Sequence, residues 1–171
     1  MKNIDLTNVQ EATDFPKLTP GGYICRITAV EDVPAKEYLK IEYDIVEGEF
    51  TGYWKKLYDS KAFWGGNFIK SYKETALPFF KAFTTAVEKS NPGYVFDNDE
   101  TKLKGKMIGL ILGEEIYTKN DGSEGKRIYV DKPRSVEQIR KGDFTIPAGR
   151  SVVKKDSGFN PVNDSDEDIP F

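Results

Sequence analysis

The stretch ALPFFKAFTTAVEKSNPG (residues 76–93) carries the clearest helix signal in the sequence and restricts the folds that the rest of the chain can adopt. Thr75 precedes it as an N-cap residue, and Pro78 falls in the first turn, where proline is tolerated. Asn91-Pro92-Gly93 then ends it. The sequence therefore predicts a helix over about residues 76–89 whose apolar stripe faces the core, formed by Leu77, Phe80, Phe83, Thr84 and Val87.

On both sides of this helix, β-forming residues with alternating polarity predict strands. Residues 38–46 alternate most regularly and place Leu39, Ile41, Tyr43 and Ile45 on one face. The sequence Lys-Asn-Asp-Gly at 119–122 is a hairpin turn signal. The predicted strands cover about residues 23–30, 38–46 and 53–58 before the helix, and 106–117 and 127–131 after it; residues 60–73, interrupted by Gly65-Gly66, give no regular pattern.

This order of three strands, one helix and a two-stranded hairpin favours a mainly β fold. It is the order of a five-stranded Greek-key barrel of the oligonucleotide-binding (OB) kind, with its helix between strands 3 and 4. A β-grasp fold or a small sandwich fits less well, because neither requires a lone helix at that point. We expect a lead-in over residues 1–19, one folded domain over residues 20–150 and a disordered acidic tail over residues 151–171.

The composition of the 171 residues argues against most enzyme classes. The chain has no histidine and a single cysteine, Cys25, which removes histidine-based catalysis, imidazole zinc sites and an internal disulfide. It also lacks a Walker-type glycine loop and a dinucleotide fingerprint. We therefore expect no enzyme activity and no cofactor. The lone cysteine and the lack of an apolar run long enough to span a membrane predict a cytoplasmic protein with no membrane partner.

The net charge of −3 conceals an uneven distribution along the chain. All 25 Lys and Arg lie at or before Lys155, whereas the last 16 residues hold five acids and no base. The body is therefore mildly basic, most of all between Lys126 and Lys155. The alternative interpretation is that these charge runs only keep the surface solvated.

Aromatic and basic residues are interleaved in two segments of the body. A protein binds single-stranded nucleic acid through flat rings on which bases stack and cations along the phosphate path. The alternatives are that the rings cap the barrel core and that the tip of the 119–122 hairpin is a solvated loop. The candidate DNA-binding residues are Trp54, Lys56, Tyr58, Lys61, Phe63 and Trp64 in the first segment, Tyr117, Lys119, Lys126, Arg127 and Tyr129 in the second, and Lys104 and Lys106 just before residues 106–117.

The end of the chain has the pattern of a peptide ligand. Four acids within residues 164–168 precede Ile169, Pro170 and Phe171, an apolar tripeptide that a solvated tail does not need. We expect the Phe171 ring to fill a pocket on a partner while the acids steer the segment to a basic rim. The predicted partner-binding residues are Asp166, Glu167, Asp168, Ile169, Pro170 and Phe171.

This ending resembles the acidic tip of bacterial single-stranded DNA-binding proteins, which finish in Asp-Asp-Asp-Ile-Pro-Phe or a close variant. Glu167 is a conservative departure from that pattern. The resemblance implies that the tip recruits replication, recombination and repair proteins, with Phe171 as the main anchor. The body over roughly residues 20–145 is similar to phage-encoded single-stranded DNA-binding proteins of Gram-positive hosts, in Ala62-Phe63-Trp64, in Ser71-Tyr72-Lys73-Glu74, in the helix and in Leu103-Lys104-Gly105-Lys106. That similarity implies an OB fold and a role in phage or prophage DNA replication or recombination, inside the host cytoplasm.

The sequence thus predicts a non-catalytic protein that binds and protects single-stranded DNA without sequence preference and recruits partners through its tip. One alternative is an adaptor that occupies host replication factors through the tip and binds no DNA. A metal-dependent nuclease using the acids from Asp97 to Glu100, and a virion structural protein, are further alternatives. The sequence leaves the oligomeric state open, a homo-oligomer included.

Overall fold

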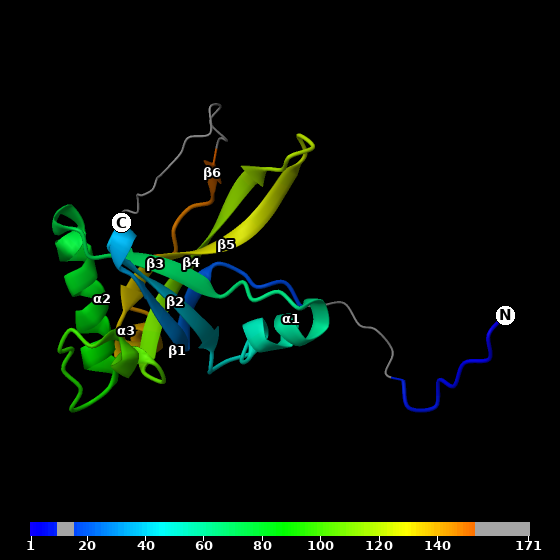
Figure 1. Ribbon diagram of the computed structural model, residues 1–171, viewed down its shortest axis with the longest axis horizontal. Coiled ribbons are helices and arrows are strands. Elements are labelled where there is room, and N and C mark those ends of the chain that lie inside the picture. The colour runs from blue at the N-terminus through cyan, green and yellow to red at the C-terminus, as the bar shows by residue number, and fades with distance from the viewer. Residues whose placement is uncertain (10–15, 153–171) are drawn as a thin grey trace.

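One sheet of six strands organises the protein in the computed structural model, which describes residues 1–9 and 16–152 (Figure 1). Its strands follow the order β3-β2-β1-β4-β5, and β6 pairs with β4 outside this path. The pairings are antiparallel except the parallel β4–β6 pairing. The strands are β1 (Gly21–Val33), β2 (Tyr38–Ile45), β3 (Asn67–Ser71), β4 (Met107–Thr118), β5 (Glu124–Arg134) and β6 (Arg150–Val152).

The sheet is strongly curved because β1 is long enough to pair with two neighbours at different heights. Its first part, Gly21 to Arg26, pairs with β4, whereas Cys25 to Val33 pairs with β2 through a register irregularity between Ile27 and Ala29. This curvature brings β3 and β5, the two ends of the strand order, toward each other. They make contacts but share no strand pairing, so the sheet is not closed. The expectation of a mainly β fold is confirmed; a closed five-stranded barrel is not observed.

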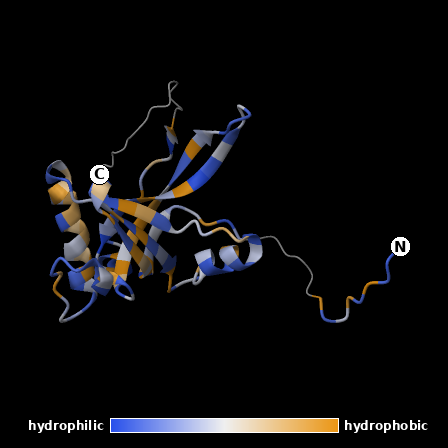
Figure 2. Cartoon of the chain, in the orientation of Figure 1, coloured by the Kyte–Doolittle hydropathy of each residue, from blue (hydrophilic) through white to orange (hydrophobic). Residues whose placement is uncertain are grey.

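Helix α2 (Leu77–Ser90) lies between β3 and β4 in the chain, as predicted, and covers one side of the sheet (Figure 1). Phe83 and Val87 are fully buried against the apolar residues of the sheet, while Leu77, expected in the same stripe, is 46% exposed. Figure 2 shows the alternation of apolar and polar residues along the strands and the mainly apolar α2. The Asn91 side chain ends the helix by bonding to Val87 and to both backbone groups of Met107, which fixes α2 to the start of β4.

The predicted strand at residues 53–58 is wrong, because these residues form helix α1 (Tyr53–Lys61). Gly52 adopts a left-handed conformation at the helix N-terminus, with φ of 72°. The carboxylate of Asp44, at the end of β2, accepts hydrogen bonds from the backbone N–H groups of Trp54 and Lys55. Two of the unpaired donors of the first helical turn are therefore satisfied by a residue ten positions earlier.

The third strand is instead β3, within the stretch that gave no sequence prediction. It follows Gly66, where an added Cβ would lie 2.4 Å from the Trp54 ring and 2.6 Å from the Tyr43 carbonyl oxygen. Only glycine lets the chain pass between this ring and β2. Trp54 thereby packs at the base of the sheet, edge-on to Tyr43 with ring centroids 6.3 Å apart.

The remaining elements agree with their sequence signals, with one addition. Ser135 and Gln138 form a capping box, a pattern visible in the sequence, at the start of helix α3 (Val136–Lys141). Strand β6 was not predicted, and it crosses the expected boundary between the domain and the tail at residue 150. Leu18, from the expected lead-in, is 2% exposed and belongs to the core. The described residues contain no helix with the length and apolar character that crossing a membrane requires.

Candidate nucleic-acid interface

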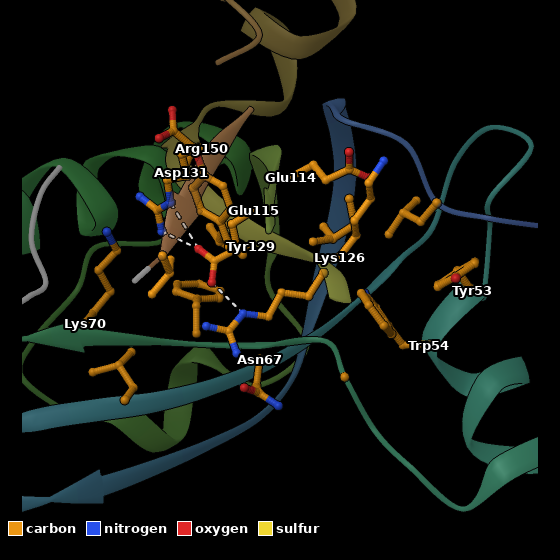
Figure 3. Close-up of a pocket in the computed structure, with 18 of the residues that line it drawn as sticks. Tyr53, Trp54, Asn67, Lys70, Glu114, Glu115, Lys126, Tyr129, Asp131 and Arg150 are labelled. Carbon is orange, nitrogen blue, oxygen red and sulfur yellow. Dashed lines mark hydrogen bonds and ion pairs between the residues drawn. The ribbon is translucent and has the colours of Figure 1, made fainter. Parts of the chain in front are cut away.

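A cleft of about 1180 Å³ occupies the gap between β3 and β5 (Figure 3). The start of α1 and Phe63 lie on one side of it, and β6 with the inner part of β4 lies on the other. Its charged lining is more basic than acidic: Lys17, Lys70, Lys126, Arg127 and Arg150 against Glu114, Glu115 and Asp131. The cleft is therefore an open, cationic channel along the seam of the sheet, which is the gap where β3 and β5 face each other without strand pairing.

A buried carboxylate organises the basic side of this cleft. Glu115 of β4 is 4% exposed and accepts hydrogen bonds from two arginines. Arg127 of β5 donates from Nε to one carboxylate oxygen. Arg150 of β6 donates from Nε and Nη2 to the other, at 3.0 and 2.7 Å. Figure 3 shows these bonds converging on Glu115. One carboxylate thus fixes cations from two strands and ties β6 to the sheet.

Each of these arginines also covers a tyrosine ring. The guanidinium carbon of Arg150 lies 3.6 Å from the centroid of Tyr129, and that of Arg127 lies 4.7 Å from the centroid of Tyr117. Guanidinium groups over tyrosine rings are stabilised by the negative face of the ring. Both guanidinium groups, which line the cleft, are therefore held against tyrosine rings as well as against Glu115.

The tyrosines can lie flat because each faces a glycine across the β4–β5 ladder. Tyr129 pairs with Gly113 and Tyr117 pairs with Gly125. An added Cβ would meet the Tyr129 ring at 2.7 Å and the Tyr117 ring at 2.8 Å, so no other residue leaves room for these rings. The result is a layer of glycine backbone, tyrosine ring and arginine that occurs twice on the hairpin.

At the narrow part of the seam, Lys70 of β3 lies opposite Asp131 of β5. Burial in the cleft lowers the pKa of Lys70 to about 8, and the nearby Asp131 carboxylate opposes that shift. Asp131 is the extra residue of a bulge, since Val130 and Lys132 pair with Leu112 and Ile111 while Asp131 has no partner in the register. The bulge directs β5 toward β3 where the ladder between them is missing.

The structure brings five of the predicted DNA-binding residues to this cleft: Trp54, Phe63, Lys126, Arg127 and Tyr129. Phe63 is 62% exposed and offers a ring face to solvent. Trp54 is only 6% exposed and is part of the core, so it does not provide an open stacking surface. A strand over residues 53–58 would put Trp54, Lys56 and Tyr58 on one face; in helix α1, Lys56 instead turns away from Trp54 and Tyr58, which are four residues apart.

The other predicted residues lie outside the cleft lining among the described residues. Tyr58 and Trp64 form a tilted ring pair, 6.2 Å between centroids, beside Phe63. Lys106 lies over the Tyr94 ring at 4.6 Å. These residues divide between three places: Lys56, Tyr58, Lys61 and Trp64 on and after α1, Tyr117 and Lys119 toward the hairpin tip, and Lys104 and Lys106 ahead of β4. Lys104 and Lys106 are thus not gathered with the hairpin residues as a single track.

Sequence reasoning missed Lys17, Lys70 and Arg150 as cleft residues. Lys70 lies in a strand that gave no sequence pattern, and Arg150 was placed at the border of the tail. The β-forming pair Phe68-Ile69, directly after Gly66 and Asn67, is the one local signal that favours a short strand here. No local feature indicates that Arg150 reaches Glu115, 35 residues earlier.

The acids from Asp97 to Glu100 are engaged in local contacts. Asp97 pairs with Lys102 at 2.6 Å, and Asp99 accepts hydrogen bonds from Thr101. The described part of the chain holds no group of three His, Cys, Asp or Glu side chains arranged to bind a metal ion. The predicted partner-binding tip, Asp166 to Phe171, lies outside the described residues.

Comparison with known proteins gives no relative: no protein-family model matches the chain, and no curated protein sequence matches it.

Proposed function

We propose that this protein binds single-stranded DNA without sequence preference, in the cleft between β3 and β5. The observation that carries this proposal is the combination of ring faces and cations along one open channel. Phe63, which is 62% exposed, and Lys126 line the channel together with the Tyr129–Arg150 layer. Bases stack on rings and on guanidinium planes, while phosphates follow cations.

We further propose that the fold is a variant of the OB fold. In support, the helix stands between strands 3 and 4, and the strand order β3-β2-β1-β4-β5 would close into a five-stranded barrel if β3 paired with β5. In this protein the seam holds the cleft instead. An open seam suits unpaired nucleotides, because bases need access to ring faces that a closed ladder would cover.

The role in phage or prophage DNA replication or recombination, and recruitment of replication or repair proteins by residues 166–171, are proposed from the resemblance of the sequence. Val152, the last described residue, lines the cleft. Deleting residues 164–171 is expected to abolish partner capture while leaving the unfolding midpoint unchanged.

The test of DNA binding is a fluorescence-anisotropy titration of labelled oligo-dT at two salt concentrations. Phe63→Ala is expected to cost about 1–3 kcal/mol of binding free energy, the contribution of one stacked base. Lys126→Gln is expected to reduce the salt slope by about 0.7, the value for one phosphate contact.

Two variants serve as matched controls. Val95→Ala removes an apolar side chain that is 73% exposed, and Lys141→Gln removes an exposed cation; neither lines the cleft. Both are expected to bind like the unaltered protein. Equal losses in cleft variants and controls would contradict the cleft as the DNA site. Absence of binding to the unaltered protein would instead favour the adaptor hypothesis.

A further inference from the structure

A second cleft adjoins the first along β5. It measures about 670 Å³ and is lined by α2, the end of β5, and the segment around and after α3. On β5, the first cleft is lined by residues 126–131 and the second by residues 132–134. The change from one to the other falls at the Asp131 bulge, so the two clefts follow one another along the same strand.

Helix α2 provides the opposite wall of both clefts. Phe79 of α2 lines the first cleft together with Ala76, the residue just before the helix, and Ala82, Ala86 and Lys89 of α2 line the second. Positions 79, 82, 86 and 89 recur at intervals of three and four residues, so they lie on one face of the helix. The side chains at 82 and 86 are small. The two clefts therefore lie along successive stretches of the same two elements, α2 and β5.

The second cleft has the charge of a phosphate-binding surface. Lys89, Lys132 and Arg134 line it, against one carboxylate, Asp143. Lys132 and Lys89 are exposed, and Arg134 donates a hydrogen bond from Nη1 to the neighbouring carbonyl of Pro133. Within residues 1–9 and 16–152, Arg134 forms no ion pair with a carboxylate, unlike Arg127 and Arg150, which Glu115 holds. Cations in such an arrangement attract a polyanion without a competing internal partner.

We propose that the bound DNA strand continues from the first cleft into this second cleft, where Lys89, Lys132 and Arg134 bind its phosphates. This inference rests on the proposed function. It adds that the site has two parts: the first holds bases on rings, and the second holds the backbone of the nucleotides that follow. The occupant is inferred from charge and from the continuity of the two clefts along β5 and α2.

Oligonucleotide length separates the two parts experimentally. OB folds bind about 4–16 nucleotides, so dT oligomers of about 6 and about 20 nucleotides are titrated with the full chain by fluorescence anisotropy. The double variant Lys132→Gln/Arg134→Gln is expected to weaken binding of the long oligomer about 10-fold and to reduce its salt slope by about 1.4, for two phosphates. Binding of the short oligomer is expected to stay within about 2-fold of the unaltered protein. Lys89→Gln, on the other wall, is expected to weaken only the long oligomer, by about 3-fold.

The control is Arg140→Gln/Lys141→Gln, which removes the same charge from α3 outside both clefts; Arg140 pairs with Glu47 and Lys141 with Glu137. It is expected to leave binding of both oligomers unchanged. Thermal unfolding of each variant excludes a loss of fold as the cause of weaker binding.

Three outcomes would overturn the inference. Unchanged binding of the long oligomer by Lys132→Gln/Arg134→Gln would remove the second cleft from the DNA path. Equal weakening of both oligomers would place these cations in the first part of the site. Tighter binding would show that the second cleft holds an acidic segment that competes with DNA. If the unaltered protein binds neither oligomer, the proposed function itself fails, which is a distinct result.

Discussion

The middle of the sheet and its two ends differ in strand pairing and in the side chains that they bury. In the middle, β1 is paired on both sides, and fully buried residues such as Ile27, Ile108 and Leu110 fill the space beneath it. At the ends, β3 and β5 approach each other without a ladder, and the cleft between them is lined by charged and aromatic side chains together with aliphatic ones. The same curved sheet therefore contains a packed region and an unpaired seam.

This difference shows how the protein reconciles stability with an accessible surface. Removing apolar area from water stabilises the fold by about 25 cal/mol per Å², and that gain is concentrated in the middle and under α2. The seam contributes little apolar burial and keeps rings and cations exposed. If this division is right, substitutions in the packed region will lower the free energy of unfolding, whereas substitutions of exposed residues at the seam will change it little.

The largest expected effect comes from the packed region. Phe83→Ala on α2 removes a fully buried ring that contacts Phe68 and Phe80, with centroids 6.1 Å away in each case. We expect it to lower the free energy of unfolding by about 3–5 kcal/mol, because the cavity cannot collapse fully. Urea denaturation measures this value.

Ile69→Ala at the seam is the matched contrast. Ile69 is 50% exposed on β3, and its truncation is expected to change the free energy of unfolding by about 0.5 kcal/mol or less. Similar losses for Ile69→Ala and Phe83→Ala would mean that the seam is as tightly packed as the middle, and the comparison would not hold.

The packed region is also the part that the sequence predicts well. Strands β1, β2, β4 and β5 and helix α2 follow from hydrophobic periodicity and helix-ending residues, because burial of one face imposes that periodicity. The capping box of Ser135 and Gln138 is equally local. These signals need no knowledge of distant residues.

The seam depends on contacts that lie far apart in the chain, and there the prediction failed. Tyr53, Trp54 and Leu57 are spaced as on a helix, yet their β-forming side chains suggested a strand. Asp44 favours the helix over the strand, because its carboxylate accepts hydrogen bonds from backbone N–H groups at the N-terminus of α1. The clustering of Lys70, Arg150 and Glu115 likewise depends on how β3, β6 and β4 meet. Residue type alone makes Phe63, Lys126, Arg127 and Tyr129 candidate DNA-binding residues, and the structure brings them to the cleft, whereas Trp54 is part of the core.

A second prediction concerns the buried carboxylate at the seam. Glu115→Gln removes the charge that holds Arg127 and Arg150, and hydrogen bonds to charged groups contribute about 1.5–3 kcal/mol each. Since both arginines remain half-exposed to water, we expect a total loss of stability of about 1.5–3 kcal/mol. We also expect faster hydrogen exchange at Ser151 and Val152, because Arg150 is the side chain that ties β6 to β4.

The neighbouring Glu114→Gln is the control for this substitution. Its carboxylate is partly exposed and lies 3.6 Å from the Lys17 ammonium, so its loss is expected to cost less than about 1 kcal/mol and to leave exchange in β6 unchanged. Should Glu115→Gln leave both stability and exchange intact, β6 would be held by its backbone pairing alone.

The last expected effect is a pH dependence that belongs to the seam and not to the packed region. Burial lowers the pKa of Lys70 to about 8 in the folded protein, against an ordinary value of 10.5. Between these two values the unfolded chain binds more protons at this residue than the folded protein does, so its contribution to the free energy of unfolding rises with pH. The stability of the unaltered protein relative to Lys70→Met is therefore expected to increase from about pH 8 to about pH 10.5 and to be constant below that window. Urea midpoints at about pH 7, 8.5 and 10 measure this difference in stability. The control is Lys81→Met, which removes an exposed lysine of α2; its difference in stability from the unaltered protein should be the same at all three pH values. A difference for Lys70→Met that is equally flat would mean that water reaches this ammonium as freely as it reaches Lys81, and the narrow part of the seam would then be as open as the rest of the cleft.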